Sequence, residues 1–391
     1  MRLREIGVFG LFMACSSADD ASVAPSDGLE NAQPVVESYA SNAFANYSDA
    51  LEGAKTLRSA IAAFTSAPSE ATHRAAKEAW IAARKPYGPS EAYRFYSGPI
   101  DDEDPSHPGP EGDINSWPLD ESFIDYTKDE PSAGLINDLS FSITKESIAK
   151  KNTEGGEANV SDGYHAIEFL LWGQDVDDPA QKTAGHRAFT DYTTATNADR
   201  RKAYLTAVAE LLVDDLQKVT DAWAPNQDNY RKTFVTDPKK ALTELLTGIG
   251  SLANAELSGQ RMSVAYTNRS QEDEHSCFSD TTNADLQGNF LGIQNVYLGT
   301  YGSNTTGPGV TSLVAAVDPA LDAKVKADLR TAAAAFAAMQ AEPFDYAIQL
   351  DDDTPERKNI LAAIAAVKTI ADDITQVGAK LGRRFQLASE E

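Results

Sequence analysis

Apolar residues recur along the chain at steps of three and four, the spacing of one face of an α-helix. The first such stripe lies between residues 36 and 64 and consists of Val36, Tyr39, Ala43, Tyr47, Ala50, Ala54, Leu57, Ile61 and Phe64. After the sequence SAPSEAT a second helix is predicted over residues 70–84. Pro86 limits it, because proline lacks the amide hydrogen that a helix interior requires. A further amphipathic helix is predicted from about residue 201 to Trp223.

Three later helices are predicted to begin in the same way, with a capping residue followed by proline at the first helical position. The three pairs are Asp237-Pro238, Asp318-Pro319 and Thr354-Pro355. Runs with the alternating pattern of a β-strand are nearly absent. The pattern therefore predicts an all-α fold, and long helices with short connections are typical of helical bundles.

Two segments interrupt this helical pattern. Residues 87–120 are dense in proline, glycine and acidic residues, and residues 268–309 are polar before they give way to a short helical pattern. Each segment follows a helix that carries arginine and aromatic residues, about midway through its half of the chain. We expect two related helical domains, an N-terminal one over residues 35–225 and a C-terminal one over residues 226–385.

The N-terminus resembles a bacterial secretory signal. Arg2 and Arg4 precede an apolar run over residues 6–13, which is too short to span a bilayer, and a small residue precedes Cys15. LFMAC resembles a lipobox, in which Cys15 is lipidated; the alternative is an ordinary signal peptide cut nearby. Ser16 after the cysteine favours the outer membrane. We expect a signal peptide over residues 1–15, a flexible tether over 16–34, and a lipid-anchored envelope protein that faces the periplasm.

Composition restricts the function classes. The formal net charge is −25, from 34 basic and 59 acidic residues, and so acidic a surface repels nucleic acid and anionic lipid. We therefore expect no nucleic-acid partner, and membrane contact only through the lipid anchor. Two cysteines exclude a disulfide framework. The chain has no P-loop, no GxGxxG after a strand and no GxSxG elbow, so no motif supports nucleotide-cofactor binding or a serine-hydrolase function.

The candidate chemistry centres on the sequence SDGYHAIEFLLWGQD, in which His165 and Glu168 lie three residues apart and share one helix face. An imidazole and a carboxylate so placed are plausible zinc or iron ligands, and the alternative is a hydrogen-bonded pair at a helix edge. Other ligands must come from elsewhere in the chain. The candidates are Glu274, His275, Ser279, Asp280 and Asp285 in EDEHSCFSDTTNAD, Arg261 before them, and Glu91 and Arg94 in SEAYRFYSGP. Each of these could instead be a solvated loop residue or a cap.

GYHAIEFLLWGQD resembles the GxHxxE motif of the imelysin-like family, which includes iron-regulated bacterial envelope lipoproteins. The resemblance extends to WIAARKPYGPSEAYRFYSGPID, INSWPLDESFIDY and RMSVAYTNRSQEDEHSCFSD, and covers the chain from the mid-30s to about residue 385. It implies an all-α fold of two four-helix-bundle-like halves with long irregular connections, and a site where the halves meet. The motif falls on Gly163, His165 and Glu168, and the family has been classed as metallopeptidases.

Two functions are compatible with these residues. In the first, which we favour, the protein binds iron, another divalent metal or an iron-containing ligand between its halves, in iron uptake or homeostasis with envelope iron-transport partners. The expected metal ligands are His165, Glu168, Glu274, His275 and Asp280. The residues expected around the ligand are Glu91, Arg94, Gly163, Trp172, Arg261, Ser279 and Asp285.

The second function is a metal-dependent peptidase in which Glu168 is catalytic. A zinc hydrolase needs three protein ligands, a bound water and a carboxylate that is free to act as base. A complete set of this kind cannot be assembled from the sequence. A third interpretation is that His165 and Glu168 only tie helices together.

Overall fold

The computed structural model describes residues 31–104, 106, 108–302 and 305–389. The predicted signal peptide, Cys15 and most of the predicted tether lie outside the described residues. Helix α1 (Ala32–Ser66) begins within the last residues of the segment predicted as tether, and Ala32 and Val35 are already buried. The predicted boundaries of the two domains stay predictions.

Four helices pack together in the first half: α1, α2 (Glu70–Tyr87), α6 (Gly163–Trp172) and α7 (Ala198–Trp223). Every residue of the predicted stripe on α1 is buried, because that face packs against both α2 and α7. Helix α2 does not stop before Pro86 but continues to Tyr87, where the chain tightens into the 3-10 helix η2 (Gly88–Tyr93). Proline in the last turn breaks only one hydrogen bond, which the packed helix tolerates.

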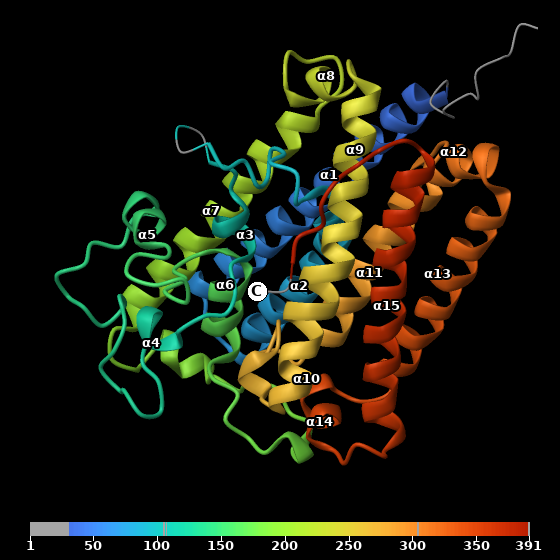
Figure 1. The fold of residues 1–391 in the computed structure, drawn as a ribbon. Helices are drawn as coiled ribbons and strands as arrows, with labels where there is room; N and C mark the ends of the chain where they lie inside the picture. The colour runs from blue at the N-terminus through green and yellow to red at the C-terminus, as the bar shows by residue number, and fades with distance from the viewer. Residues whose placement is uncertain (1–30, 105, 107, 303–304, 390–391) are drawn as a thin grey trace, which may run out of the picture.

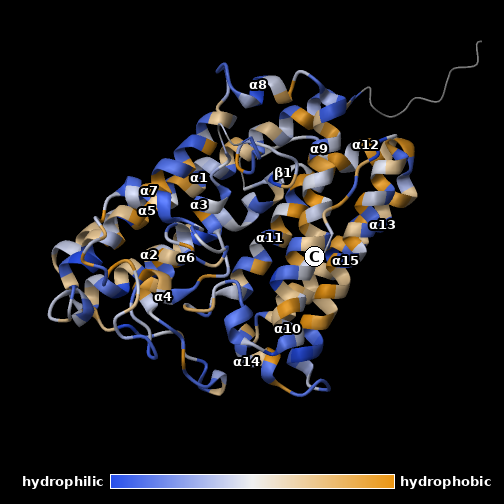
Figure 2. Cartoon of the chain, turned by 60° about the vertical axis from the view of Figure 1, so that its left-hand side comes forward, coloured by the Kyte–Doolittle hydropathy of each residue, from blue (hydrophilic) through white to orange (hydrophobic). Residues whose placement is uncertain are grey.

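The second half contains a long helical segment and three further long helices. The segment is formed by α9 (Pro238–Ser251), η5 (Leu252–Ser263) and α10 (Val264–Asn268). Helices α11 (Thr282–Leu298) and α15 (Pro355–Lys380) pack against it, α13 (Pro319–Met339) packs on both of these helices, and α12 (Val310–Val317) packs against α13. In Figure 2, hydrophobic and hydrophilic residues alternate along α13 and α15, as expected of helices that bury one face.

The predicted capping residues differ in what they do. The Asp237 side chain accepts hydrogen bonds from the amides of Lys239 and Lys240, and the Asp318 side chain accepts one from Leu321. Thr354 makes no such bond, and its hydroxyl donates instead to the carbonyl of Asp351. All three helices nevertheless begin at the proline that follows.

Segment η5 is a π-helix of 12 residues, where the sequence predicts a continuous α-helix. Its wider turn is seen at its end, where the amide of Val264 bonds to the carbonyl of Gly259. Such segments are rare and occur frequently at functional sites. This one carries Glu256 and Arg261 toward the junction of the two halves.

The two halves lie side by side, with α11 packed against η2 and α2 (Figure 1). The remaining described elements are short and lie in the connections: α3 (Glu111–Asn115), α4 (Glu121–Ile124), α5 (Lys145–Lys151), η3 (Pro179–Gln181), η4 (Phe189–Tyr192), α8 (Tyr230–Phe234), η6 (Gln271–Asp273), α14 (Phe344–Gln349), and the paired strands β1 (Thr300–Tyr301) and β2 (Thr305–Thr306). The structure confirms the predicted all-α fold of two four-helix-bundle-like halves. Among the described residues, no helix has the length and apolarity of a membrane span.

Candidate ligand site between the two halves

Gly163 is the first residue of helix α6, and it determines how closely α3 packs against the start of that helix. Its φ is +79°, and a Cβ atom there would lie 2.6 Å from the carbonyl oxygen of Ile114 and 2.8 Å from that of Asp113. Only glycine combines this left-handed conformation with such close backbone contact. The first position of the GxHxxE motif therefore lets α3 pack directly against α6.

His165 and Glu168 form the buried pair that the helical spacing predicts. His165 Nδ1 lies 2.8 Å from Glu168 Oε2, and both side chains are buried. The other carboxyl oxygen of Glu168 accepts bonds from the amide of Ser279 at 2.9 Å and its hydroxyl at 2.7 Å. Burial raises the pKa of Glu168 to about 8 and lowers the pKa of His165 well below its ordinary value. At neutral pH this pair therefore carries little net charge.

His275 is held in the same manner by a second carboxylate. Its Nδ1 lies 3.0 Å from Asp285 Oδ2, which also accepts a bond from Arg84 at 2.9 Å and one from the Ser276 hydroxyl. Burial alone would raise the pKa of Asp285, but Arg84 holds that pKa well below its usual range. Burial, with Arg261 nearby, lowers the pKa of His275 to about 3. Nδ1–H of His275 thus donates a hydrogen bond to the ionised Asp285, and Nε2 of His275 keeps its lone pair.

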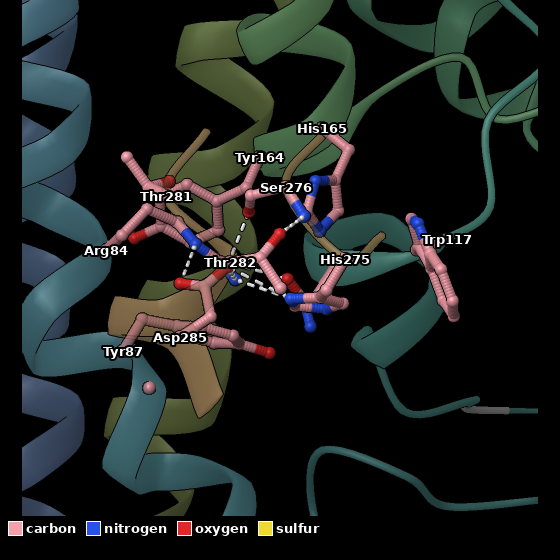
Figure 3. A network of polar contacts seen from close by, with 12 residues as sticks. Arg84, Tyr87, Trp117, Tyr164, His165, His275, Ser276, Thr281, Thr282 and Asp285 are labelled. Carbon is pink, nitrogen blue, oxygen red and sulfur yellow. Dashed lines mark hydrogen bonds and ion pairs between the residues drawn. The ribbon is translucent and has the colours of Figure 1, made fainter. Parts of the chain in front are cut away.

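The two imidazoles meet at the junction of the halves (Figure 3). The ring centroids of His165 and His275 lie 4.7 Å apart at an interplanar angle of 77°, and the indole of Trp117 packs on His275. Neither Nε2 atom has a hydrogen-bond partner among the described residues, although both are buried. A buried polar atom without a hydrogen-bond partner lowers the stability of the fold, so two such nitrogen atoms side by side suggest a functional role.

A second buried network of charges adjoins the histidines. Glu91 accepts bonds from Arg261 at 2.8 Å and Arg94 at 2.5 Å, and these guanidinium groups, against the cost of burial, lower the pKa of Glu91 to about 2. The side chain of Asn115 joins the two networks: it accepts from Arg84 at 2.5 Å and donates to Glu91 at 3.4 Å. Arg94 also pairs with Glu111, and Arg261 with Glu256 and Asn289. The ion pairs therefore fix the halves against each other.

Three residues predicted for the site lie elsewhere. Asp280 gathers with Asp175 and Asp345 instead of with the histidines. Glu274 offers its backbone carbonyl to Trp117, while burial and the nearby Asp345 raise the pKa of its carboxyl group well above the usual range. Trp172 packs edge to face on Trp80 with 5.4 Å between ring centroids, so it belongs to the core.

The five predicted metal ligands thus do not converge. Within the described part of the chain, His165, Glu168 and His275 belong to no set of three histidine, cysteine or acidic side chains whose ligand atoms all lie within 4.8 Å of one another. A closed tetrahedral zinc centre of these residues does not fit the geometry, because it needs three or four protein ligands. Nε2 of His275 has a lone pair, and Nε2 of His165 would have one once the neutral His165–Glu168 pair releases its proton. These two nitrogens fit a metal whose remaining positions are filled by water or by the donor atoms of a bound ligand.

Several residues of the site were not predicted from the sequence: Arg84, Asn115, Trp117, Ser276 and Asn289. For Arg84 a signal was present. It lies four residues after Trp80 and three before Tyr87, on a stripe whose members are all buried. A charged residue on an apolar helix face must have a buried partner. Asn115 and Trp117 lie in an irregular segment, where no periodicity indicates which side chains turn inward.

Comparison with known proteins agrees with this fold. The Synechococcus elongatus protein named iron-regulated protein A is 26% identical over 305 residues, which is 75% of this chain and 69% of that protein. A Parabacteroides distasonis structure described as an iron-regulated protein A precursor superposes with a TM-score of 0.69 at 19% identity, over 92% of this chain and 97% of the other. An imelysin-like protein from Psychrobacter arcticum gives 0.62 at 14% identity, over 91% and 97%. Likeness at these identities shows the fold alone.

The sequence itself carries the family assignment. The model of the Imelysin family, which is classed among the peptidases, matches residues 43–374 and so most of the chain. That range contains the GxHxxE motif and both buried networks of the junction. The chain therefore belongs to the Imelysin family.

Proposed function

We propose that this protein binds iron or an iron-containing ligand at the junction of its two halves, and that it serves iron uptake or homeostasis in the bacterial envelope. The observation that carries the proposal is the pair of buried imidazoles, each held at Nδ1 by a carboxylate and each with Nε2 unpartnered among the described residues. A relative named for iron regulation supports the choice of metal.

Each carboxylate would orient its histidine for binding. Hydrogen bonding of Nδ1 to a carboxylate fixes the imidazole and raises its basicity, which is the usual arrangement of metal-bound histidine. His165 depends on Glu168 and Ser279, and His275 depends on Asp285 and Arg84. Bound iron would act as a Lewis acid, and its remaining coordination positions would be filled by donor atoms of the small molecule that carries it or by water. The proposed site therefore joins one histidine from each half.

The envelope location is part of the same proposal. It rests on the lipobox-like LFMAC with Cys15 as the lipidated residue, and on the Ser16 that follows it. A lipid on Cys15 would anchor the folded domains to the outer membrane and face them to the periplasm. There they would exchange iron with envelope transport proteins.

A metal-dependent peptidase is the alternative function, in keeping with the classification of the family. In this geometry Glu168 faces His165 through one carboxyl oxygen and Ser279 through the other, so it is not free to activate a water. Peptide cleavage that a chelator abolishes and that Glu168→Gln also abolishes would favour the peptidase. Cleavage that survives both treatments would indicate a contaminating protease.

Isothermal titration calorimetry tests the binding proposal directly. Ferrous, ferric and zinc ions are titrated into the full chain and into His165→Ala and His275→Ala. We expect iron to bind the wild type and each variant to lose at least tenfold in affinity, because each removes one imidazole ligand. His186→Ala is the matched control, since His186 is exposed on a connecting loop. If the alanine variants are unfolded by circular dichroism, His165→Gln and His275→Gln replace them.

No iron binding by the wild type would overturn the proposal. Unchanged affinity in folded variants at both histidines would overturn it as well. If only the stability of the variants falls, His165 and Glu168 tie helices together and bind no ligand.

A further inference from the structure

Three carboxylates from separate segments converge beside the loop that carries His275. Asp175 follows the end of α6, Asp280 lies two residues before the start of α11, and Asp345 lies in the first turn of α14. One oxygen of each lies within 4.8 Å of the others. Residues this distant in sequence meet only because the tertiary fold brings them together.

The environment of Asp345 indicates that the group has a missing partner. Its side chain is only 2% exposed, and neither of its carboxyl oxygens has a hydrogen-bond partner among the residues described. Oδ1 of Asp280 is likewise unpartnered within those residues. The side chains of Asp175 and Asp280 share a hydrogen bond, and Asp175 also accepts one from the amide of Asp177 at 3.3 Å. A buried carboxylate without hydrogen bonds or a counter-charge is strongly unfavourable.

The lysine beside α14 is engaged elsewhere. Lys182, at the end of η3 beside α14, pairs with Glu342 and stacks over Tyr346. Across the described ranges, no lysine or arginine forms an ion pair with Asp175, Asp280 or Asp345. Glu274, which is 1% exposed, adds a fourth acidic group nearby.

We propose that Asp175, Asp280 and Asp345 form a binding site for a hard divalent cation, best matched by Ca²⁺. Oxygen-only donor sets select hard cations, and Ca²⁺ accepts the irregular geometry that three loop and helix-end carboxylates offer. Waters and backbone carbonyls would complete its coordination. The partial exposure of Asp280 gives the ion a route from solvent.

The protonation of the group in the absence of metal agrees with this assignment. Burial, reinforced by the neighbouring carboxylates, raises the pKa of Asp280 to about 7 and that of Asp175 to about 6. Burial also raises the pKa of Asp345. The group is therefore stabilised by added positive charge, whether protons or a cation.

A cation at this position would brace the histidine site. Asp280 directly follows Ser279, whose amide and hydroxyl both bond to Glu168. Asp175 continues from the helix that carries His165 and Glu168, and its carbonyl accepts a 2.7 Å bond from Gln271 before the loop begins. Occupancy of the acidic group would hold the loop of His275 against the end of α6. Cation binding by these three carboxylates does not depend on what the histidines bind.

Thermal unfolding of the chelator-treated full chain, titrated with Ca²⁺, Mg²⁺ or Mn²⁺, tests the site. We expect Ca²⁺ to raise the Tm of the wild type and calorimetry to give one bound ion. Asp345→Asn and Asp280→Asn should weaken Ca²⁺ binding at least tenfold. Without metal, Asp345→Asn should melt at or above the wild-type Tm, because it removes one of the crowded acids. Asp353→Asn, an exposed acid on another loop, is the charge-matched control and should keep the full Ca²⁺ response.

The absence of a Ca²⁺-dependent rise in Tm in the wild type would overturn the site. An unchanged Ca²⁺ response in both Asp345→Asn and Asp280→Asn would do the same, and a response to Mg²⁺ or Mn²⁺ alone would overturn the assignment to Ca²⁺. The Ca²⁺ response should persist in His165→Ala, which separates this site from the one between the histidines.

Discussion

His165 and His275 face each other across the junction of the two halves, with ring centroids 4.7 Å apart. Each ring is held through Nδ1 by a carboxylate, Glu168 in one case and Asp285 in the other. The two carboxylates are in opposite states. Burial raises the pKa of Glu168, whereas Arg84 holds the pKa of Asp285 low. The junction thus combines one nearly neutral pair with one firmly ionised network.

Asp285→Asn tests how much the ionised network contributes to stability. The substitution leaves Arg84 buried without its counter-charge, and breaking a buried ion pair in this way costs about 3–5 kcal/mol. Urea denaturation should show this loss in the free energy of unfolding. Asp214→Asn is the control, because Asp214 forms an exposed pair with Lys145 and such pairs contribute about 1 kcal/mol or less. Similar losses in the two variants would show that the Arg84 pair is not a major stabilising contact.

Gly163→Ala tests why the motif begins with glycine. Its Cβ would overlap the carbonyl oxygens of Ile114 and Asp113, and the residue would also adopt a left-handed φ. We expect a loss of about 3 kcal/mol or more, since strain and overpacking each cost about 1–3 kcal/mol. Gly382→Ala isolates the conformational part, because Gly382 has a φ of +62° and its added Cβ meets no atom within 4 Å. The loss in free energy of unfolding should be clearly larger for Gly163→Ala; equal losses would refute the role of close backbone contact.

His73 provides a prediction for pH dependence. His73 is buried and stacks on Phe64, and its Nε2 lies 2.7 Å from the carbonyl oxygen of Leu171. Burial and Lys77 lower the pKa of His73 to about 4. In the unfolded chain His73 takes up a proton at its ordinary pKa of about 6.5, whereas in the folded chain it does so only near pH 4. Stability therefore falls as the pH drops from about 6.5 to 4.

The contribution of His73 to this acid sensitivity is on the order of 3 kcal/mol, from about 1.4 kcal/mol per pKa unit. His73→Gln keeps an amide donor for the Leu171 carbonyl but cannot titrate. The difference in unfolding free energy between wild type and variant should shrink by that amount between pH 7 and pH 4. The measurement is a series of urea denaturation curves at fixed pH. Parallel pH profiles for the two proteins would contradict the assigned pKa.

The helices were predictable because their signals are local. The apolar stripe on α1 and the Asp-Pro starts of α9 and α13 appear as the sequence indicates. The π-helix η5 could not be predicted in this way, since its residues have ordinary helical periodicity and its wider turn accompanies the pairing of Arg261 with Glu91 from the other half.

The candidate site was predictable only in part. Spacing on one helix places His165 beside Glu168, and the family blocks indicate the loop that supplies His275 and Ser279. Within that loop, neighbours in sequence diverge: Ser279 turns to Glu168, and Asp280 turns to Asp175 and Asp345. Asp280 has a φ of +55°, and a single left-handed residue reverses the direction of the chain. Such local reversals depend on tertiary packing, which no residue spacing records.

The central claim is that His165 and His275 together hold iron, and the iron content of the protein in its native envelope tests it most directly. Wild type, the double variant His165→Ala/His275→Ala and the control His186→Ala are isolated from the envelope under iron-replete conditions and analysed by mass spectrometry for metals. We predict iron in the wild type and in His186→Ala, and its loss from the folded double variant. Equal iron in the double variant, or none in the wild type, would contradict the claim.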